Sequence, residues 1–183
     1  MFNNLNIVVG VTGGIAVYKV CGIVSYLTQN GANVDVIMTE NATKFVNPLT
    51  LEILSQNKVT VDMFDRDFFY DIHHISLAQK SDLFLVVPAT ANIIGKIANG
   101  IADDMLSTTI MATKANVVFA PAMNNNMYDN PIVQDNISKL KKHGYKFIDP
   151  VIGHLACGEK ARGKLASNEE IIEYVKVLTK KVK

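Results

Sequence analysis

The stretch Leu83-Phe84-Leu85-Val86-Val87-Pro88-Ala89-Thr90-Ala91-Asn92 (residues 83–92) decides the fold. Its five leading apolar residues predict a strand covered on both faces, which stops at Pro88 and delivers Asn92 just beyond its carboxyl end. The stretch 117–127 repeats this plan, with an apolar run that meets a proline and delivers Asn124. In an open parallel α/β sheet, ligands bind outside the carboxyl ends of the strands, so the two asparagine amides could face one small molecule.

Apolar runs alternate with amphipathic segments along the rest of the chain. Further strand-like runs occur at residues 5–9, 34–38 and 145–148. Between the runs, apolar residues recur at helical spacing, as on the face formed by Val17, Val20, Cys21, Val24 and Leu27. This alternation predicts an α/β fold over residues 1–183: one domain with a doubly wound parallel sheet, a Rossmann-like (flavodoxin-like) three-layer sandwich.

Local signals complete this reading of the chain. Gly31 and Gly144 are expected to end the helices that precede them. Residues 59–61 are a weaker candidate strand, and residues 62–71, which mix acids with aromatics, are expected to form a loop packed by its aromatic side chains. Glycines and charges in residues 153–164 predict a mobile loop.

Composition excludes several classes of function. With 183 residues, 49% of them hydrophobic and 19% charged, the chain can bury a sizeable core, and a net charge of +1 gives no reason to expect nucleic acid or an anionic membrane as a partner. No apolar run reaches the length of a membrane span and no signal peptide is recognisable, so a cytoplasmic protein is expected. Cys21 and Cys157 suggest no disulfide framework, and no metal-ligand spacing occurs.

A glycine turn, Gly10-Val11-Thr12-Gly13-Gly14-Ile15, follows the first strand and precedes a helix. This geometry suits a phosphate held by backbone N–H groups at a helix N-terminus, although a turn that simply reverses the chain is the plainer alternative. The spacing is neither that of a dinucleotide fingerprint nor that of a P-loop. At the end of the second strand, Thr39 is a candidate ligand or, more simply, a helix cap.

Three side chains could transfer protons, and the amides of Asn92 and Asn124 could orient a carboxylate or carbonyl. His73 and His74 stand at the start of a predicted helix, where a histidine is either a plain surface residue or a proton-transfer group. Cys157, between Ala156 and Gly158, is a candidate for an accessible thiol. Met123 and Met127 are most simply packing residues, but they would also suit the wall of a flat aromatic ring.

Six motifs, in order and spacing, resemble the flavin-dependent cysteine decarboxylases over roughly residues 5–175. They are Gly13-Gly14-Ile15-Ala16, His74-Ile75-Ser76-Leu77-Ala78, Pro88-Ala89-Thr90-Ala91-Asn92, Ala102-Asp103-Asp104, Pro121-Ala122-Met123-Asn124 with Met127, and Leu155-Ala156-Cys157-Gly158. The chain departs from the usual pattern at four places: Tyr128 for Trp, Met105 for Leu, Ala161 for Gly and Lys164 for Arg.

The resemblance implies a cofactor, a set of site residues and self-association. FMN would be held by Gly13, Gly14, Ile15, Thr39, Thr90, Ala91, Asn92 and Met123. His74 is similar to the family's catalytic histidine, Asn124 to the asparagine that binds the substrate carboxylate, and Cys157 to a proton donor on a flap that covers the substrate. Met127, Ala156 and Lys164 would also contact substrate. The family further implies a homotrimer or a multiple of it, with no metal.

The same resemblance implies decarboxylation of phosphopantothenoylcysteine to 4'-phosphopantetheine in coenzyme A biosynthesis, through a thioaldehyde and an enethiol. Cys157 favours this reaction over decarboxylation of a peptide's C-terminal cysteine, which stops at the enethiol. Flavin prenyl transfer fits poorly, since His74, Asn124 and Cys157 would have no task. A non-catalytic FMN-binding regulatory subunit is a further alternative.

Overall fold

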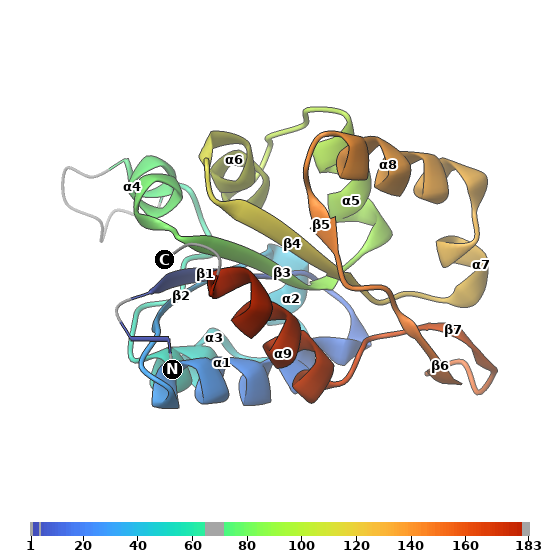
Figure 1. Cartoon of the computed structure of the whole chain (residues 1–183), viewed down its shortest axis with the longest axis horizontal. Helices are drawn as coiled ribbons and strands as arrows, with labels where there is room; N and C mark the ends of the chain where they lie inside the picture. The colour runs from blue at the N-terminus through green and yellow to red at the C-terminus, as the bar shows by residue number, and fades with distance from the viewer. Residues whose placement is uncertain (1, 4, 65–71, 181–183) are drawn as a thin grey trace.

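A parallel five-stranded sheet forms the centre of the computed structural model, which describes residues 2, 3, 5–64 and 72–180 (Figure 1). Its strand order is β2-β1-β3-β4-β5, the doubly wound order of flavodoxin-like sheets, so the predicted fold class is confirmed. The strands are β1 (Asn6–Val11), β2 (Asn33–Met38), β3 (Leu83–Ala89), β4 (Asn116–Pro121) and β5 (Lys146–Phe147).

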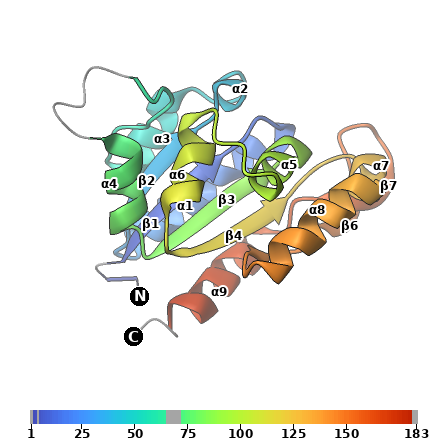
Figure 2. The same ribbon diagram turned by 90° about the horizontal axis from the view of Figure 1, so that it is seen from above.

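Helices cover both faces of the sheet. On one face lie η1 (Ile15–Lys19), a 3-10 helix that leads into α1 (Val20–Gln29), with α3 (Pro48–Ser55) and α9 (Asn168–Thr179). The other face carries, side by side in Figure 2, α4 (His73–Lys80), α6 (Met105–Ala112), α5 (Ala91–Ala98) and α8 (Pro131–Lys142). Single turns follow β2 and β4, as α2 (Glu40–Thr43) and α7 (Asn125–Tyr128). Within the described residues, no helix has the length and apolar character needed to cross a membrane.

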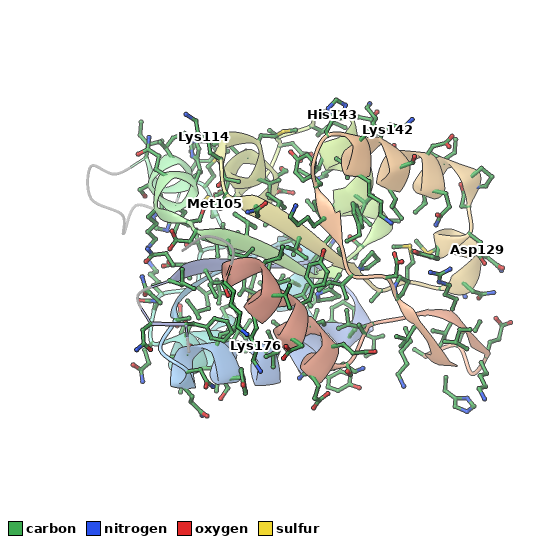
Figure 3. All side chains as sticks on the ribbon, in the orientation of Figure 1. Met105, Lys114, Asp129, Lys142, His143 and Lys176 are labelled. Atoms are coloured by element: carbon green, nitrogen blue, oxygen red, sulfur yellow. The ribbon has the colours of Figure 1, made fainter. Side chains whose placement is uncertain are left out.

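The core consists of two apolar layers, one on each side of the sheet. Val24 and Leu27 of α1 pack in one layer with Ile171 of α9, and all three side chains are buried. The opposite layer holds residues of α4, α5, α6 and α8, including Met105. Met105 is 1% exposed, whereas Lys114 and Lys142 lie on the outside of the same helical layer (Figure 3). The departure from Leu at residue 105 therefore concerns core packing.

Two local predictions differ from the structure, and a third lies mostly outside the described residues. β3 continues through Pro88 to Ala89, because the β3–β4 register shifts between Val86 and Ala89, where a residue without an N–H is tolerated. Residues 59–61 make one bridge, between Ile37 and Thr60, rather than a strand. In the expected packed loop at 62–71, residues 65–71 lie outside the described residues. Gly31 and Gly144 adopt positive φ after α1 and α8, as predicted.

The loop expected at residues 153–164 is instead mostly an antiparallel hairpin. Strands β6 (Val151–His154) and β7 (Lys160–Lys164) pair with each other in a second, two-stranded sheet. In Figure 1 the hairpin projects beyond the main sheet, next to α7 and α9. Glycines obscured the strand signal in the sequence, because Gly153 and Gly163 interrupt the alternation of side chains that reveals a strand.

Candidate functional site

A cavity of about 580 Å³ lies at the carboxyl ends of β1, β3 and β4, next to the hairpin. This volume falls within the range of small-molecule sites. Four segments line it: Gly13, Gly14, Ile15, Ala16, Tyr18 and Lys19; Thr90 and Ala91; Ala122, Met123, Asn124 and Met127; and His154, Leu155, Ala156, Cys157, Gly163, Lys164 and Leu165. Most residues predicted to form the site are therefore brought together.

The two glycines of the turn have different surroundings: Gly13 is closely packed, whereas Gly14 has open space beside it. A Cβ on Gly13 would lie 2.6 Å from the Cβ of Asn41, so the turn packs closely against α2. A Cβ on Gly14 would meet only Thr90 Cγ2, at 3.9 Å. The turn therefore presents bare backbone to the cavity beside Thr90. The helix that follows begins as the 3-10 helix η1, rather than as the regular α-helix expected.

A buried hydroxyl joins the glycine turn to the Thr90 segment. Thr12 Oγ1 donates to the carbonyl of Pro88 over 2.6 Å and accepts from the N–H of Thr90 over 3.1 Å. The Thr90 side chain accepts from the N–H of Ile93 and caps α5. Thr12 is 2% exposed and was not among the predicted site residues. A polar residue between an apolar strand and paired glycines was the signal that could have found it.

Backbone hydrogen bonds connect the remaining segments. The N–H of Ala122 donates to the carbonyl of Ala89 over 3.1 Å, which links the ends of β4 and β3. Met123 N donates to the carbonyl of Gly163 over 3.0 Å, which links the end of β4 to the hairpin. Gly163 has φ 138°, and a Cβ there would collide with the Met123 carbonyl. Only glycine lets the hairpin approach this closely.

Asn124 and Cys157 lie together at the cavity. Asn124 Oδ1 accepts from the N–H of Asn126 over 2.9 Å, so the side chain caps α7 and its amide nitrogen is directed elsewhere. That nitrogen, Nδ2, donates to Cys157 Sγ over 3.6 Å. Cys157 is exposed on the turn between β6 and β7. The geometry presents an amide donor and a thiol to the same small volume.

Two lysines give the cavity a positive charge. Lys19 and Lys164 both line it, and among its described lining residues none is acidic. Burial lowers the pKa of Lys19, the charge of Lys164 lowers it further, and Glu169 opposes the change. The stem of Lys164 packs over Gly153, where a Cβ would lie 2.7 Å from Lys164 Cδ. Two ammonium groups in one cavity favour an anionic ligand.

Three predicted site residues do not line the cavity of this chain. Thr39 stands at the carboxyl end of β2, where its hydroxyl accepts from the N–H of Ala42 and caps α2. Asn92 is exposed in the first turn of α5. His74 is half-buried on α4, and its neighbour His73 lies with Nε2 2.9 Å from Thr60 Oγ1.

Comparisons with known proteins identify the family of the chain. The family model described as Flavoprotein matches residues 1–180. The chain is 54% identical over 173 residues to the coenzyme A biosynthesis bifunctional protein CoaBC of Bacillus subtilis, covering 94% of this chain and 43% of that protein. It is 44% identical over 171 residues to the probable phosphopantothenoylcysteine decarboxylase of Streptococcus mutans, covering 92% of this chain and 96% of that protein. The chain thus spans less than half of the first relative's length.

Solved structures also resemble this chain over nearly its whole length. A cysteine-to-serine mutant of PPC decarboxylase, complexed with pantothenoylaminoethenethiol, matches with a TM-score of 0.87 and 26% identity over 97% of this chain and 100% of the other. The FMN-dependent cysteine decarboxylase SpaF matches with a TM-score of 0.82 and 27% identity, over 95% of this chain and 96% of the other. Matched over nearly its whole length by the family model and by relatives well above 30% identity, the chain belongs to the flavoprotein family.

Proposed function

We propose that the protein is an FMN-dependent decarboxylase that converts phosphopantothenoylcysteine to 4'-phosphopantetheine in coenzyme A biosynthesis. One observation carries this proposal: the Asn124 amide and the Cys157 thiol meet in a positively charged cavity beside a glycine turn. The names of the relatives in Bacillus subtilis and Streptococcus mutans support the same reaction. The cytoplasmic location expected from the sequence remains a prediction.

The residues of the cavity fit FMN. The open backbone at Gly14, beside Thr90, leaves room for a ligand to approach closely, and Ile15, Ala91 and Met123 supply apolar walls for a flat ring. Gly13 would hold the cofactor through its backbone. Thr39 and Asn92 stay candidates outside this cavity, at the same edge of the sheet. When bound, FMN would supply reversible hydride acceptance, which no side chain of the protein offers.

Asn124 and Cys157 have distinct tasks in this proposal. A cysteine carboxylate cannot lose carbon dioxide without an electron sink, and oxidation of the sulfur-bearing carbon to a thioaldehyde provides one. Asn124 binds the carboxylate through its amide and holds it beside the cofactor's position. Loss of carbon dioxide leaves an enethiol, and Cys157 gives the proton that accompanies its reduction to the saturated thiol. Met127 and Ala156 line the same space and would contact the substrate.

The two lysines support a phosphorylated substrate. Lys19 and Lys164 supply two positive charges to a cavity with no described acidic lining residue. A phosphate monoester carries about −1.5 to −2 charges at neutral pH, which this pair would balance. A peptide ending in cysteine carries the carboxylate but no phosphate monoester. The pair therefore favours the coenzyme A precursor over the peptide alternative.

Self-association is part of the proposal, because one chain leaves the predicted site incomplete. His74 does not line the cavity of its own chain, so a second copy would have to supply it. At the rim of the cavity, Ile15 and Tyr18 are 61% and 63% exposed, which suits contact with another copy. We retain the homotrimer, or a multiple of it, as the expected assembly.

Mass spectrometry of the products tests the function directly. Purified protein loaded with FMN is incubated without oxygen with phosphopantothenoylcysteine or with a peptide ending in cysteine. Loss of carbon dioxide from the first substrate without net oxidation is the expected result. Turnover of the peptide alone would favour the peptide decarboxylase. Bound FMN with turnover of neither substrate would favour a regulatory subunit.

A further inference from the structure

Thr12 links the segments that follow β1 and β3 just beyond the end of the ladder between these two strands. The parallel ladder between β1 and β3 runs from Ile7 with Leu83 to Gly10 with Val86. Beyond that point β1 and β3 are no longer paired with each other, although Val11 still pairs with β2 and Ala89 with β4. The Thr12 hydroxyl bridges them there, through the Pro88 carbonyl and the Thr90 N–H.

The two segments joined by Thr12 are the ones that present backbone to the cavity. Gly13 and Gly14 follow Thr12 directly, and Thr90 and Ala91 lie on the other side of the bridge. Since Thr90 also caps α5, its position sets where that helix begins. The Thr12 side chain does not itself line the cavity, so any effect on a ligand must pass through these neighbours.

We propose that Thr12 is a positioning residue of the flavin site, whose hydroxyl holds the glycine turn and the Thr90 segment at the separation that FMN requires. The proposal rests on FMN binding in the proposed function. A hydroxyl donates and accepts at once, and here it uses both capacities over 2.6 and 3.1 Å. Valine has the same shape but neither capacity, so it would leave a buried carbonyl and a buried N–H without this partner.

FMN affinity of the apoprotein tests the proposal without reference to catalysis. Thr12→Val, Thr12→Ala and Thr12→Ser are titrated with FMN and followed by flavin fluorescence, after circular dichroism has shown each apoprotein to be folded. Loss of the hydroxyl is expected to weaken FMN binding about 10- to 100-fold. Thr12→Ser keeps the hydroxyl and is expected to bind FMN nearly as tightly as the wild type.

Thr109→Val is the matched control. Thr109 is also fully buried, and its hydroxyl donates to the Met105 carbonyl over 2.7 Å within α6, away from the cavity. It is expected to lower the unfolding midpoint as Thr12→Val does but to leave FMN affinity unchanged.

Several outcomes would overturn the positioning role. One is unchanged FMN affinity in folded Thr12→Val and Thr12→Ala. Another is that Thr12→Ser weakens FMN binding as much as the variants without a hydroxyl. The third is that both variants without a hydroxyl fail to fold while Thr109→Val folds. If the wild-type apoprotein takes up no FMN, both the proposed function and the role of Thr12 fail. If the wild type binds FMN and the Thr12 variants bind it equally well, only the role of Thr12 fails.

Discussion

The amide nitrogen of Asn124 lies 3.6 Å from the sulfur of Cys157, which joins the end of β4 to the turn of the hairpin. A thiol is a weak acceptor, whereas a carboxylate is a strong one. A substrate carboxylate would therefore displace Cys157 from the amide and leave the thiol next to the carbon atoms that react. In the proposed function, the same pair would place carboxylate binding and proton donation within one substrate's length.

Replacing Cys157 with serine should separate decarboxylation from reduction. A serine hydroxyl is a far weaker acid than a thiol, whose ordinary pKa is about 8.5, so the last protonation should be slow. Cys157→Ser is expected to release carbon dioxide and to yield a product two hydrogens short of 4'-phosphopantetheine. Anaerobic mass spectrometry distinguishes the two products. Saturated product at an undiminished rate would make Cys157 a packing residue.

Mixed oligomers test whether His74 acts on the cavity of another copy. His74→Asn removes a proton-transfer group, and Asn124→Asp sets a carboxylate against the substrate carboxylate, so each variant alone should be folded and inactive. If the histidine comes from a second copy, co-expression of both variants should restore about a quarter of the wild-type activity, because random pairing unites the intact side chains in one site of four. A mixture as inactive as its components would place both residues in the same chain's site.

Lys19 should make substrate affinity sensitive to alkaline pH. Burial and the neighbouring Lys164 lower the pKa of Lys19, so its positive charge is lost at a lower pH than that of an ordinary lysine. The KM for the phosphorylated substrate should rise as pH passes through this lowered pKa. Lys19→Arg, which stays protonated, should move the rise to higher pH. Substrate lacking the phosphate is the control, and an identical rise with that substrate would contradict the assignment.

Gly163→Ala should loosen the hairpin. A Cβ at residue 163 would collide with the Met123 carbonyl and sit at φ 138°, so the hydrogen bond between the Met123 N–H and the Gly163 carbonyl should break. Faster alkylation of Cys157 by iodoacetamide is expected, with lower kcat/KM. Gly144→Ala is the control, because φ is 91° there but a Cβ would meet nothing within 4 Å. Equal thiol reactivity in both variants would count against a steric role for Gly163.

Asp104 should contribute stability that is lost in acid. Burial disfavours its charge, but hydrogen bonds from Ser107 and Lys96 outweigh burial and lower the pKa of Asp104. A lowered carboxyl pKa stabilises the fold above the unfolded-state value, and this stabilisation disappears as pH falls through the folded-state value. Asp104→Ala should therefore lower the free energy of unfolding by about 1–2 kcal/mol near neutral pH, and in urea titrations this difference should shrink as the pH falls through the lowered pKa. A difference that persists unchanged in acid would exclude the charge as its cause.

The fold and much of the site could be predicted because their signals are local. The apolar run at 83–87 is buried throughout, and Asn124 follows its strand closely enough to be placed at the correct edge. Cys157 was placed in the cavity only through its family resemblance, because its contact with Asn124 spans 33 residues of sequence.

Other parts of the site depend on distant partners or on further chains. The role of Thr12 depends on backbone groups 76 and 78 residues away, which no periodicity reveals. Thr39 has the same sequence signature whether it caps a helix or binds a ligand, and in the structure it caps α2. His74 matches the motif but does not line the cavity of its own chain, and the sequence of one chain does not specify an assembly that would bring it to another copy.

The hairpin forms a sheet of its own, and we expect it to unfold separately from the main sheet. Over the described residues, β6 and β7 form ladder bonds only with each other. The hairpin contacts the body through the Met123–Gly163 and Asn124–Cys157 hydrogen bonds and through Arg162, which lies 5.3 Å from the centre of the Tyr128 ring. Its amide hydrogens should therefore exchange with solvent sooner than those of β1, β3 and β4. If the substrate binds only to molecules whose hairpin is closed over the cavity, its affinity depends on the fraction of such molecules. The measured substrate affinity then includes the free energy of closing the hairpin. Stiffening the hairpin alone would then tighten binding without adding a single contact to the substrate.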